Sequence, residues 1–253
     1  MDRLIFTSNS AIKEQSVARQ VLVNELANVS TVGFKTSYDV ALSSVKAEGP
    51  GFDTRFQAQA ISRDYIRMTP GALMLTGRSL DIAMADKTLL SVQAPNGEQA
   101  YTRRGDLKVN IQGQLETGNG HLVLGQNGPI TVPANTKLSI NPDGTIYARD
   151  PAQAANAPGI LVDRLRILDG SKEMFERRED GLFKVSGKPP GTPFESGPVL
   201  PQIIPNTLEG SNVSGIEALT RLMDHSRTFE MQIKIIKETK SLDESGATLM
   251  KST

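Results

Sequence analysis

The sequence predicts an α+β fold in which helices at the two ends of the chain pair as a coiled-coil stem, and a central antiparallel β-rich barrel or sandwich domain lies between them. Apolar residues recur at steps of three or four near both ends, the helical pattern, whereas the middle alternates between apolar and polar residues. Tight-turn dipeptides punctuate the middle about every ten residues. We therefore divide the chain into a stem helix (1–36), an extended connector (37–72), the central β domain (73–187), a proline-rich return segment (188–207) and a second stem helix (208–253).

The N-terminal helix is predicted from one narrow face of small and apolar residues. This face suits close packing against another helix. Gly33 follows at a position where a C-terminal cap takes a residue with positive φ. The face consists of Leu4, Ala11, Gln15, Ala18, Leu22, Leu26 and Val29.

The connector begins near Tyr38, and the sequence EGPG at residues 48–51 breaks any regular element there. Beyond it, two groups of alternating residues predict half-buried strands, Leu80 to Met84 and Leu107 to Ile111. Later strands are expected at Leu165 to Ile167 and at Phe183 to Val185. The turns between strands are predicted at Asn96-Gly97, Gln112-Gly113, Asn119-Gly120 and Asp143-Gly144.

The return segment holds six of the 14 prolines, between Pro189 and Pro205, which disfavours a helix or a central strand there. Ser214 and Glu217 then have the spacing of a capping box, so a helix is expected to begin at that point. Its apolar stripe is Ile216, Leu219, Met223, Ser226, Phe229, Ile233 and Ile236. A helix over residues 214–242 would be roughly 40 Å long, longer than a small domain is wide, so part of it must find a partner.

Composition excludes several classes of function. Equal numbers of acidic and basic residues, 28 each, give no electrostatic reason to expect nucleic acid or an anionic membrane as a partner. The chain has no cysteine, no apolar run long enough to span a membrane and no pattern of a cleavable secretory signal. Its two histidines, His121 and His225, are too few for a typical metal site.

Catalytic and ligand-binding motifs are likewise not recognisable. The glycine-rich runs at 118–120 and 125–128 lack the lysine and the following helix of a phosphate-binding loop. Carboxylates such as Asp163, Asp169, Glu173 and Asp180 are scattered. We assign no catalytic residue, cofactor, metal or small-molecule substrate.

Two motifs at the ends of the chain resemble those of a known family. Residues 26–35, LANVSTVGFK, resemble the N-terminal signature of flagellar basal-body rod and hook proteins, and residues 208–213, LEGSNV, resemble the signature before their last helix. Inner segments add to the resemblance, namely MTPG (68–71), TGRSLDIA (76–83), YTRRG (101–105) and NPDGTI (141–146). Nearly the whole chain is covered, and the match is closest to the proximal-rod branch of the family, the F type.

The resemblance implies a structural subunit of the flagellar rod, not an enzyme. Its terminal helices would assemble into a helical tubular array that transmits torque, with other rod proteins and copies of itself as partners. Such a protein would leave the cytoplasm through the flagellar export apparatus, without a cleavable signal, and reside in the periplasm-spanning rod of the basal body. The residues assigned to assembly are Leu4, Ala11, Ala18, Leu22, Leu26, Asn28, Gly33, Phe34, Ile216, Leu219, Met223, Phe229, Ile233 and Ile236.

A second hypothesis is a monomeric secreted β domain that binds carbohydrate or peptide and uses its helices as a local clamp. The two hypotheses differ in the free chain, because stem helices that await other subunits should exchange their amide hydrogens rapidly. An enzyme acting on peptidoglycan through two carboxylates is a third and weaker hypothesis.

Overall fold

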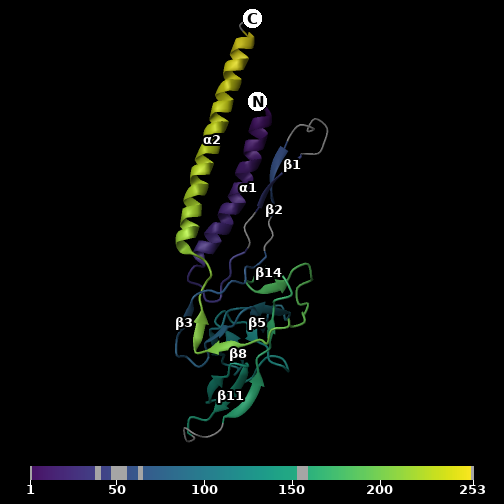
Figure 1. The fold of residues 1–253 in the computed structure, drawn as a ribbon, viewed down its shortest axis with the longest axis vertical. Helices are drawn as coiled ribbons and strands as arrows, with labels where there is room; N and C mark the ends of the chain where they lie inside the picture. The colour runs from purple at the N-terminus through teal and green to yellow at the C-terminus, as the bar shows by residue number, and fades with distance from the viewer. Residues whose placement is uncertain (1, 38–40, 47–55, 62–64, 153–158, 252–253) are drawn as a thin grey trace. The chain divides into compact units, whose positions relative to one another are not determined.

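The computed structural model describes residues 2–37, 41–46, 56–61, 65–152 and 159–251, and it is made mostly of strands with two long helices (Figure 1). The predicted α+β class is confirmed. The chain divides into two compact units. The helical unit comprises residues 1–27, 39–63 and 214–253, and the β-rich unit comprises residues 28–38 and 64–213.

The helical unit contains α1 (Asp2–Ala27) and α2 (Gly215–Lys251), which lie side by side (Figure 1). It also contains an antiparallel pair of strands, β1 (Ala41–Lys46) and β2 (Phe56–Ile61), whose register runs from Ala41 opposite Ile61 to Lys46 opposite Phe56. The sequence predicted an extended connector here but not the pairing of these two strands, since backbone pairing needs no strong apolar pattern. The predicted break at residues 48–51 lies outside the described residues.

The start of α2 follows the predicted cap in part. The Ser214 hydroxyl accepts a hydrogen bond from the Glu217 backbone N–H at 3.4 Å, which satisfies one free donor of the first turn. The Glu217 carboxylate instead pairs with Arg221 at 2.7 Å, one turn along the exposed surface. Only the hydroxyl half of the capping box is formed.

The β-rich unit contains one large antiparallel sheet and three small ones. The strand order of the large sheet is β14-β15-β6-β5-β9-β8-β7, with β13 paired to β5. The sheet does not close on itself. The described strands therefore do not form the barrel that was one of the two predicted architectures. The large sheet consists of β5 (Thr88–Gln93), β6 (Gln99–Thr102), β7 (Leu107–Val109), β8 (Leu115–Thr117), β9 (Leu122–Val123), β13 (Ile167–Asp169), β14 (Phe175–Arg177) and β15 (Phe183–Val185).

The small sheets bring distant parts of the chain together. A three-stranded sheet is formed by β10 (Lys137–Ile140), β11 (Thr145–Arg149) and β12 (Ile160–Arg164). The other two sheets each join a strand near the start of the unit to a strand near its end. They are β16 (Ile203–Pro205) on β4 (Ile82–Met84), and β17 (Thr207–Glu209) on β3 (Leu73–Leu75).

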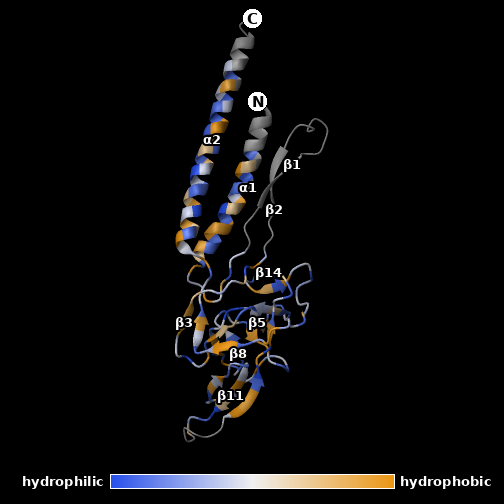
Figure 2. Ribbon diagram, in the orientation of Figure 1, coloured by the Kyte–Doolittle hydropathy of each residue, from blue (hydrophilic) through white to orange (hydrophobic). Residues whose placement is uncertain are grey.

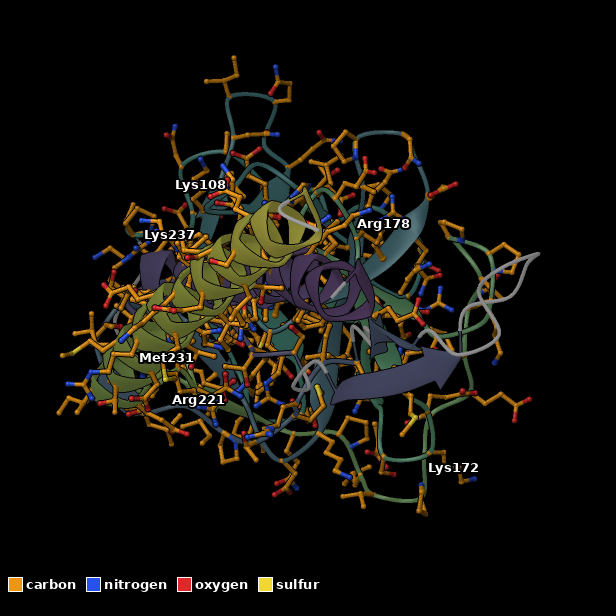
Figure 3. The ribbon with its side chains drawn as sticks, turned by 90° about the horizontal axis from the view of Figure 1, so that it is seen from above. Lys108, Lys172, Arg178, Arg221, Met231 and Lys237 are labelled. Carbon is orange, nitrogen blue, oxygen red and sulfur yellow. The ribbon has the colours of Figure 1, made fainter. Side chains whose placement is uncertain are left out.

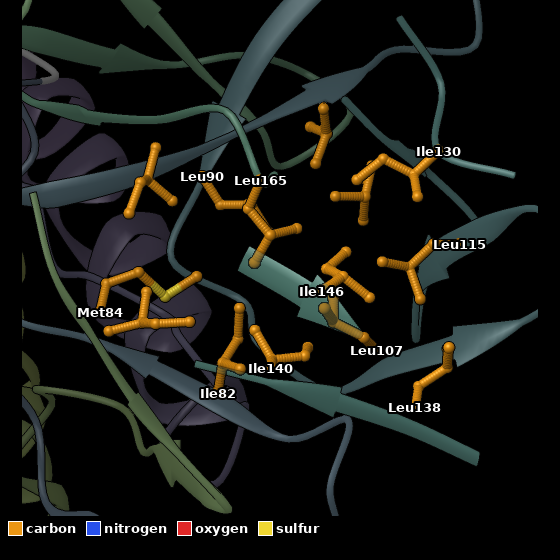
Figure 4. Close-up of a cluster of buried hydrophobic side chains, with 14 of the residues drawn as sticks. Ile82, Met84, Leu90, Leu107, Leu115, Ile130, Leu138, Ile140, Ile146 and Leu165 are labelled. Atoms are coloured by element: carbon orange, nitrogen blue, oxygen red, sulfur yellow. The ribbon is translucent and has the colours of Figure 1, made fainter. Parts of the chain in front are cut away.

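Two apolar clusters form the core of this unit. The larger one is aliphatic and gathers side chains from both the large and the small sheets, among them Ile82, Leu90, Leu107, Ile140 and Ile146 (Figure 4). The smaller one is aromatic, with the rings of Tyr101, Phe175 and Phe194 packed edge to face at centroid distances of 4.8–6.1 Å.

The turn chemistry is confirmed, whereas two predicted alternations are wrong. All four predicted turn glycines, Gly97, Gly113, Gly120 and Gly144, have positive φ between paired strands. In β4, however, Ile82, Ala83 and Met84 are all buried, so this strand is covered on both faces. After Leu107, Val109 is exposed and Ile111 lies fully exposed in the following turn.

Candidate assembly junction

Two segments next to the helices meet inside the β-rich unit. We call residues 28–37, which follow α1, the N-terminal junction segment, and residues 206–213, which precede α2, the C-terminal junction segment. The Gly33 N–H donates to the Glu209 carbonyl oxygen at 2.7 Å, and the Asn212 N–H donates to the Phe34 carbonyl oxygen at 3.3 Å. The Thr36 N–H donates to the Asn212 side-chain oxygen at 2.7 Å. The two segments are thus bonded directly to each other.

A buried carboxylate stands at the centre of this contact. One oxygen of Glu209 accepts from Lys35 Nζ at 2.6 Å and from the Gly71 backbone N–H at 3.0 Å, and the other accepts from Arg103 Nε at 2.7 Å. The side chains of Lys35, Arg103 and Glu209, which we call the junction triad, are all at most 1 % exposed. Such short, charge-assisted bonds are strong because no water competes for them.

The cations of the triad are held by backbone carbonyl groups of the β-rich unit. Arg103 donates from Nη1 to the carbonyl oxygens of Asp86 at 2.6 Å and Thr88 at 3.1 Å, and from Nη2 to that of Met84 at 2.6 Å. Lys35 donates to the Thr69 carbonyl oxygen at 2.8 Å. Two cations and one anion are therefore buried together, and carbonyl dipoles offset the excess positive charge.

Asn212 forms a second, uncharged tie between the junction and the rest of the unit. Its side-chain oxygen accepts from the Thr36 N–H, and its amide nitrogen donates to the Arg67 carbonyl oxygen at 3.0 Å and to the Thr69 hydroxyl at 3.0 Å. A single side chain thus joins both junction segments to the chain that leads into β3.

Burial and charge act in opposite directions on the ionisation of the triad. Burial tends to raise the pKa of the Glu209 carboxyl, but the charge of Arg103 and hydrogen bonds from Arg103 and Lys35 outweigh it, so this pKa lies below its ordinary value. Burial, followed by the charge of Arg103, lowers the pKa of Lys35 despite its bond to Glu209.

This ionisation predicts that the stability of the β-rich unit depends on pH. Because the pKa of Glu209 is lower in the folded chain, its contribution is complete above the unfolded pKa of about 4.3 and is lost as the pH falls through the folded value. Glu209→Gln removes the titration. We expect the gap in free energy of unfolding between wild type and E209Q to be largest near neutral pH and to narrow below about pH 5. Urea unfolding at a series of pH values measures it, and a gap that stays constant would contradict the assignment.

Gly33 and Phe34, two predicted assembly residues, lie at the junction. The helix α1 ends at Ala27, so the prediction that Gly33 caps it is wrong, although its φ is positive at 68°. Gly33 instead lies against the backbone of Arg103, where an added Cβ would be 2.5 Å from the carbonyl carbon. The Arg177 guanidinium lies 4.2 Å from the centre of the Phe34 ring and also donates to the Lys35 carbonyl oxygen.

The predicted residues at the start of the junction and along α1 fall on a largely covered face. Asn28 accepts a hydrogen bond from the Thr31 hydroxyl at 3.1 Å, within a turn. Leu22 is buried, and Ala11, Ala18 and Leu26 are partly covered. Leu4 belongs to α1, but its side chain lies outside the described part of the structure.

The predicted stripe on α2 is for the most part exposed in the single chain. Ile216 is 83 % exposed, and Leu219, Met223 and Phe229 are also exposed, whereas Ile233 and Ile236 are partly covered. The covered positions elsewhere on the helix mix apolar and polar residues, namely Ala218, Leu222, His225, Thr228, Gln232 and Thr239. Figure 2 shows the resulting mixture of apolar and polar residues along α2, and Figure 3 draws Arg221, Met231 and Lys237 on it.

Arg103 and Glu209 lie within the motifs at residues 101–105 and 208–213, but the sequence predicts no role for them. No spacing rule pairs residue 35 with residues 103 and 209, because their meeting depends on the sheet topology. The only local signal is a charged side chain within each motif, at positions that the fold buries completely.

The described residues do not suggest chemistry of another kind. Among them, no group of three His, Asp or Glu side chains is placed to hold a metal ion. No helix within these ranges is both long and apolar enough to cross a bilayer. A groove of about 910 Å³ lies beside Glu209, and its lining includes Met68, Leu73, Met174 and Ile204.

Comparison with known proteins identifies two matching segments. Residues 84–148 match the model described as the flagellar hook protein FlgE/F/G D1 domain, and residues 204–249 match the flagellar basal body rod FlgEFG protein C-terminal model.

Whole-length relatives extend the similarity. The flagellar basal-body rod protein FlgF of Salmonella typhimurium is 38% identical and covers 97% of this chain and 96% of the relative. FlgF of Escherichia coli K12 is 37% identical over 93% of both chains. The rod protein FlgG of Caulobacter vibrioides is 29% identical over 91% of this chain and 92% of its own length.

Proposed function

We propose, because this chain belongs to the flagellar basal-body rod protein family, that α1 and α2 pair as a coiled-coil stem through which copies assemble. The protein is a structural subunit of the F type, not an enzyme. In this proposal the stems of neighbouring subunits pack against one another in a helical tubular array. The exposed part of the predicted stripe, Ile216, Leu219 and Met223, supplies the contact between subunits, and the covered faces of α1 and α2 hold the stem of each subunit together.

The observation that supports this proposal is the distribution of apolar side chains on α2. A helix that served only its own chain would bury its apolar residues and expose its polar ones. On α2, Ile216, Leu219 and Met223 are exposed, whereas the covered side holds Thr228, Gln232 and Thr239 as well as Ala218 and Leu222. Exposed apolar side chains that share one side of a helix are typical of a surface that another protein covers.

The rod of the basal body is where the protein acts, in assembly with other rod proteins. We further propose that it contacts copies of itself, that it reaches the periplasm-spanning rod through the flagellar export apparatus, and that no cleavable signal directs it. The alternative of a monomeric carbohydrate- or peptide-binding domain is not favoured, because the relatives that match the whole chain are rod proteins.

Polar substitutions on the stripe should abolish assembly without unfolding the subunit. In the double variant Leu219→Gln, Met223→Gln, we expect the purified chain to keep its helix content, because both side chains are exposed before assembly. Incorporation into rods should be lost, because the amide groups would have to be buried without partners. Circular dichroism of the free chain and isolation of basal bodies from a strain lacking the natural subunit measure the two effects.

A matched control lies on the same turns of α2. Asp224→Gln with Arg227→Gln places two glutamines at exposed positions and breaks only an exposed ion pair with atoms 3.8 Å apart, which contributes little. This control should incorporate normally. Normal incorporation of the L219Q/M223Q variant would reject the proposed interface.

A further inference from the structure

We propose that the junction is a mechanical clamp, which fastens the chain crossings to one another so that the β-rich unit can carry torque. This inference rests on the proposed function in one respect, because it requires that neighbouring subunits hold the helices. The clamp itself lies wholly within the β-rich unit, between residues 28–37, residues 206–213 and the strands that they contact.

The need for a clamp follows from the path of the chain. The backbone passes between the two units at residues 27–28, 38–39, 63–64 and 213–214. A single unsupported crossing is free to rotate about its φ and ψ angles, so it can transmit tension but no torque. Crossings that are bonded laterally to one another cannot rotate independently, and the assembly then resists twisting.

The junction provides lateral bonds between segments that adjoin all four crossings, because residues 28–37 lie between the crossings at 27–28 and 38–39. The segment after residue 27 and the segment before residue 214 are joined by the bonds from Gly33 to Glu209 and from Thr36 to Asn212. The chain that follows residue 64 is bonded to both of these segments. The Arg67 N–H donates to the Thr36 carbonyl oxygen at 2.8 Å, and Asn212 donates to the Arg67 carbonyl oxygen.

The junction triad anchors this bundle of segments to the sheets. Glu209 belongs to β17, which pairs with β3, and Arg103 connects its carboxylate to three carbonyl groups between β4 and β5. Lys35 fixes the N-terminal segment to the same carboxylate. Separating opposite charges costs more free energy in a buried site than at an exposed one. The ion pairs of the triad should therefore resist an applied force strongly, until the two junction segments have moved a short distance apart.

Force spectroscopy on the purified chain tests the clamp directly. The chain has no cysteine, so Ser30→Cys and Ile111→Cys give unique handles at two exposed positions of the β-rich unit. At constant force, the first event in the wild type should be release of the N-terminal segment. Glu209→Gln should shorten the lifetime before this event at least about tenfold, which corresponds to about 1.4 kcal/mol in the barrier.

Two further variants keep the test decisive. Asn212→Ala removes the uncharged tie and should also shorten the lifetime, even if E209Q were too unstable to handle. Glu116→Gln breaks a cross-strand pair with Lys108 at the surface, at 3.1 Å, and should leave the lifetime unchanged. Equal lifetimes in the wild type, E209Q and N212A would overturn the clamp. Because this experiment involves no assembly, it can fail while the rod interface stands, and the reverse also holds.

Discussion

Replacing Glu209 by Gln should lower the free energy of unfolding of the β-rich unit by about 3–5 kcal/mol, the usual cost of removing one partner from a buried ion pair. The amide has the shape of the carboxylate but not its charge, so Lys35 and Arg103 remain buried as cations without a counter-charge. Urea unfolding at neutral pH measures the loss. Tyr65, Tyr101 and Tyr147 belong to the β-rich unit and the chain has no tryptophan, so the fluorescence of these three tyrosines reports on this unit.

The control for this prediction is again Glu116→Gln, whose pair with the half-exposed Lys108 lies at the edge of the sheet and should contribute no more than about 1 kcal/mol. If E209Q unfolds at the same urea concentration as the wild type, the triad does not stabilise the unit.

Substituting Gly33 in the N-terminal junction segment by Ala should strongly lower the free energy of unfolding of the β-rich unit. The left-handed backbone at φ 68° costs an L-residue about 1–2 kcal/mol. The added Cβ would also lie 2.5 Å from backbone atoms of Arg103, and such overpacking typically costs about 1–3 kcal/mol more. The same fluorescence-monitored urea titration measures the sum.

Gly120 provides a matched comparison. Its φ is 87°, but an added Cβ would meet nothing within 4 Å, so Gly120→Ala isolates the cost of the left-handed backbone. We expect G33A to lose clearly more stability than G120A. Equal losses would mean that the segment shifts freely away from Arg103, and the close approach of the two backbones would then have no energetic role.

Local signals in the sequence predicted the elements whose causes are local. The turn glycines at 97, 113, 120 and 144 and the cap at Ser214 depend on neighbours a few residues away, and all are present. The pair β1 and β2 was missed because its pairing depends on backbone hydrogen bonds that leave no strong pattern in residues 41–61.

For the predicted assembly residues, too, the sequence predicts what depends on local periodicity but not what depends on distant contacts. The periodicity of α1 predicted the side that is covered, from Ala11 to Leu26. On α2 the apolar stripe was identified, but periodicity cannot tell whether its own chain or another one covers the stripe. The junction triad could not be predicted from local sequence, since Lys35 and Glu209 are 174 positions apart and meet where the two junction segments bond to each other.

The pairing of β16 with β4 and of β17 with β3 also determines the order in which the molecule can mature. Each sheet joins residues 73–84 to residues 203–209, so the β-rich unit cannot complete these two sheets until more than four fifths of the polypeptide is available. A chain emerging from a ribosome or a narrow channel, N-terminus first, would keep the buried Lys35 and Arg103 without their carboxylate until Glu209 appears. Contacts of such high sequence separation form slowly, so the β-rich unit becomes rigid late in folding.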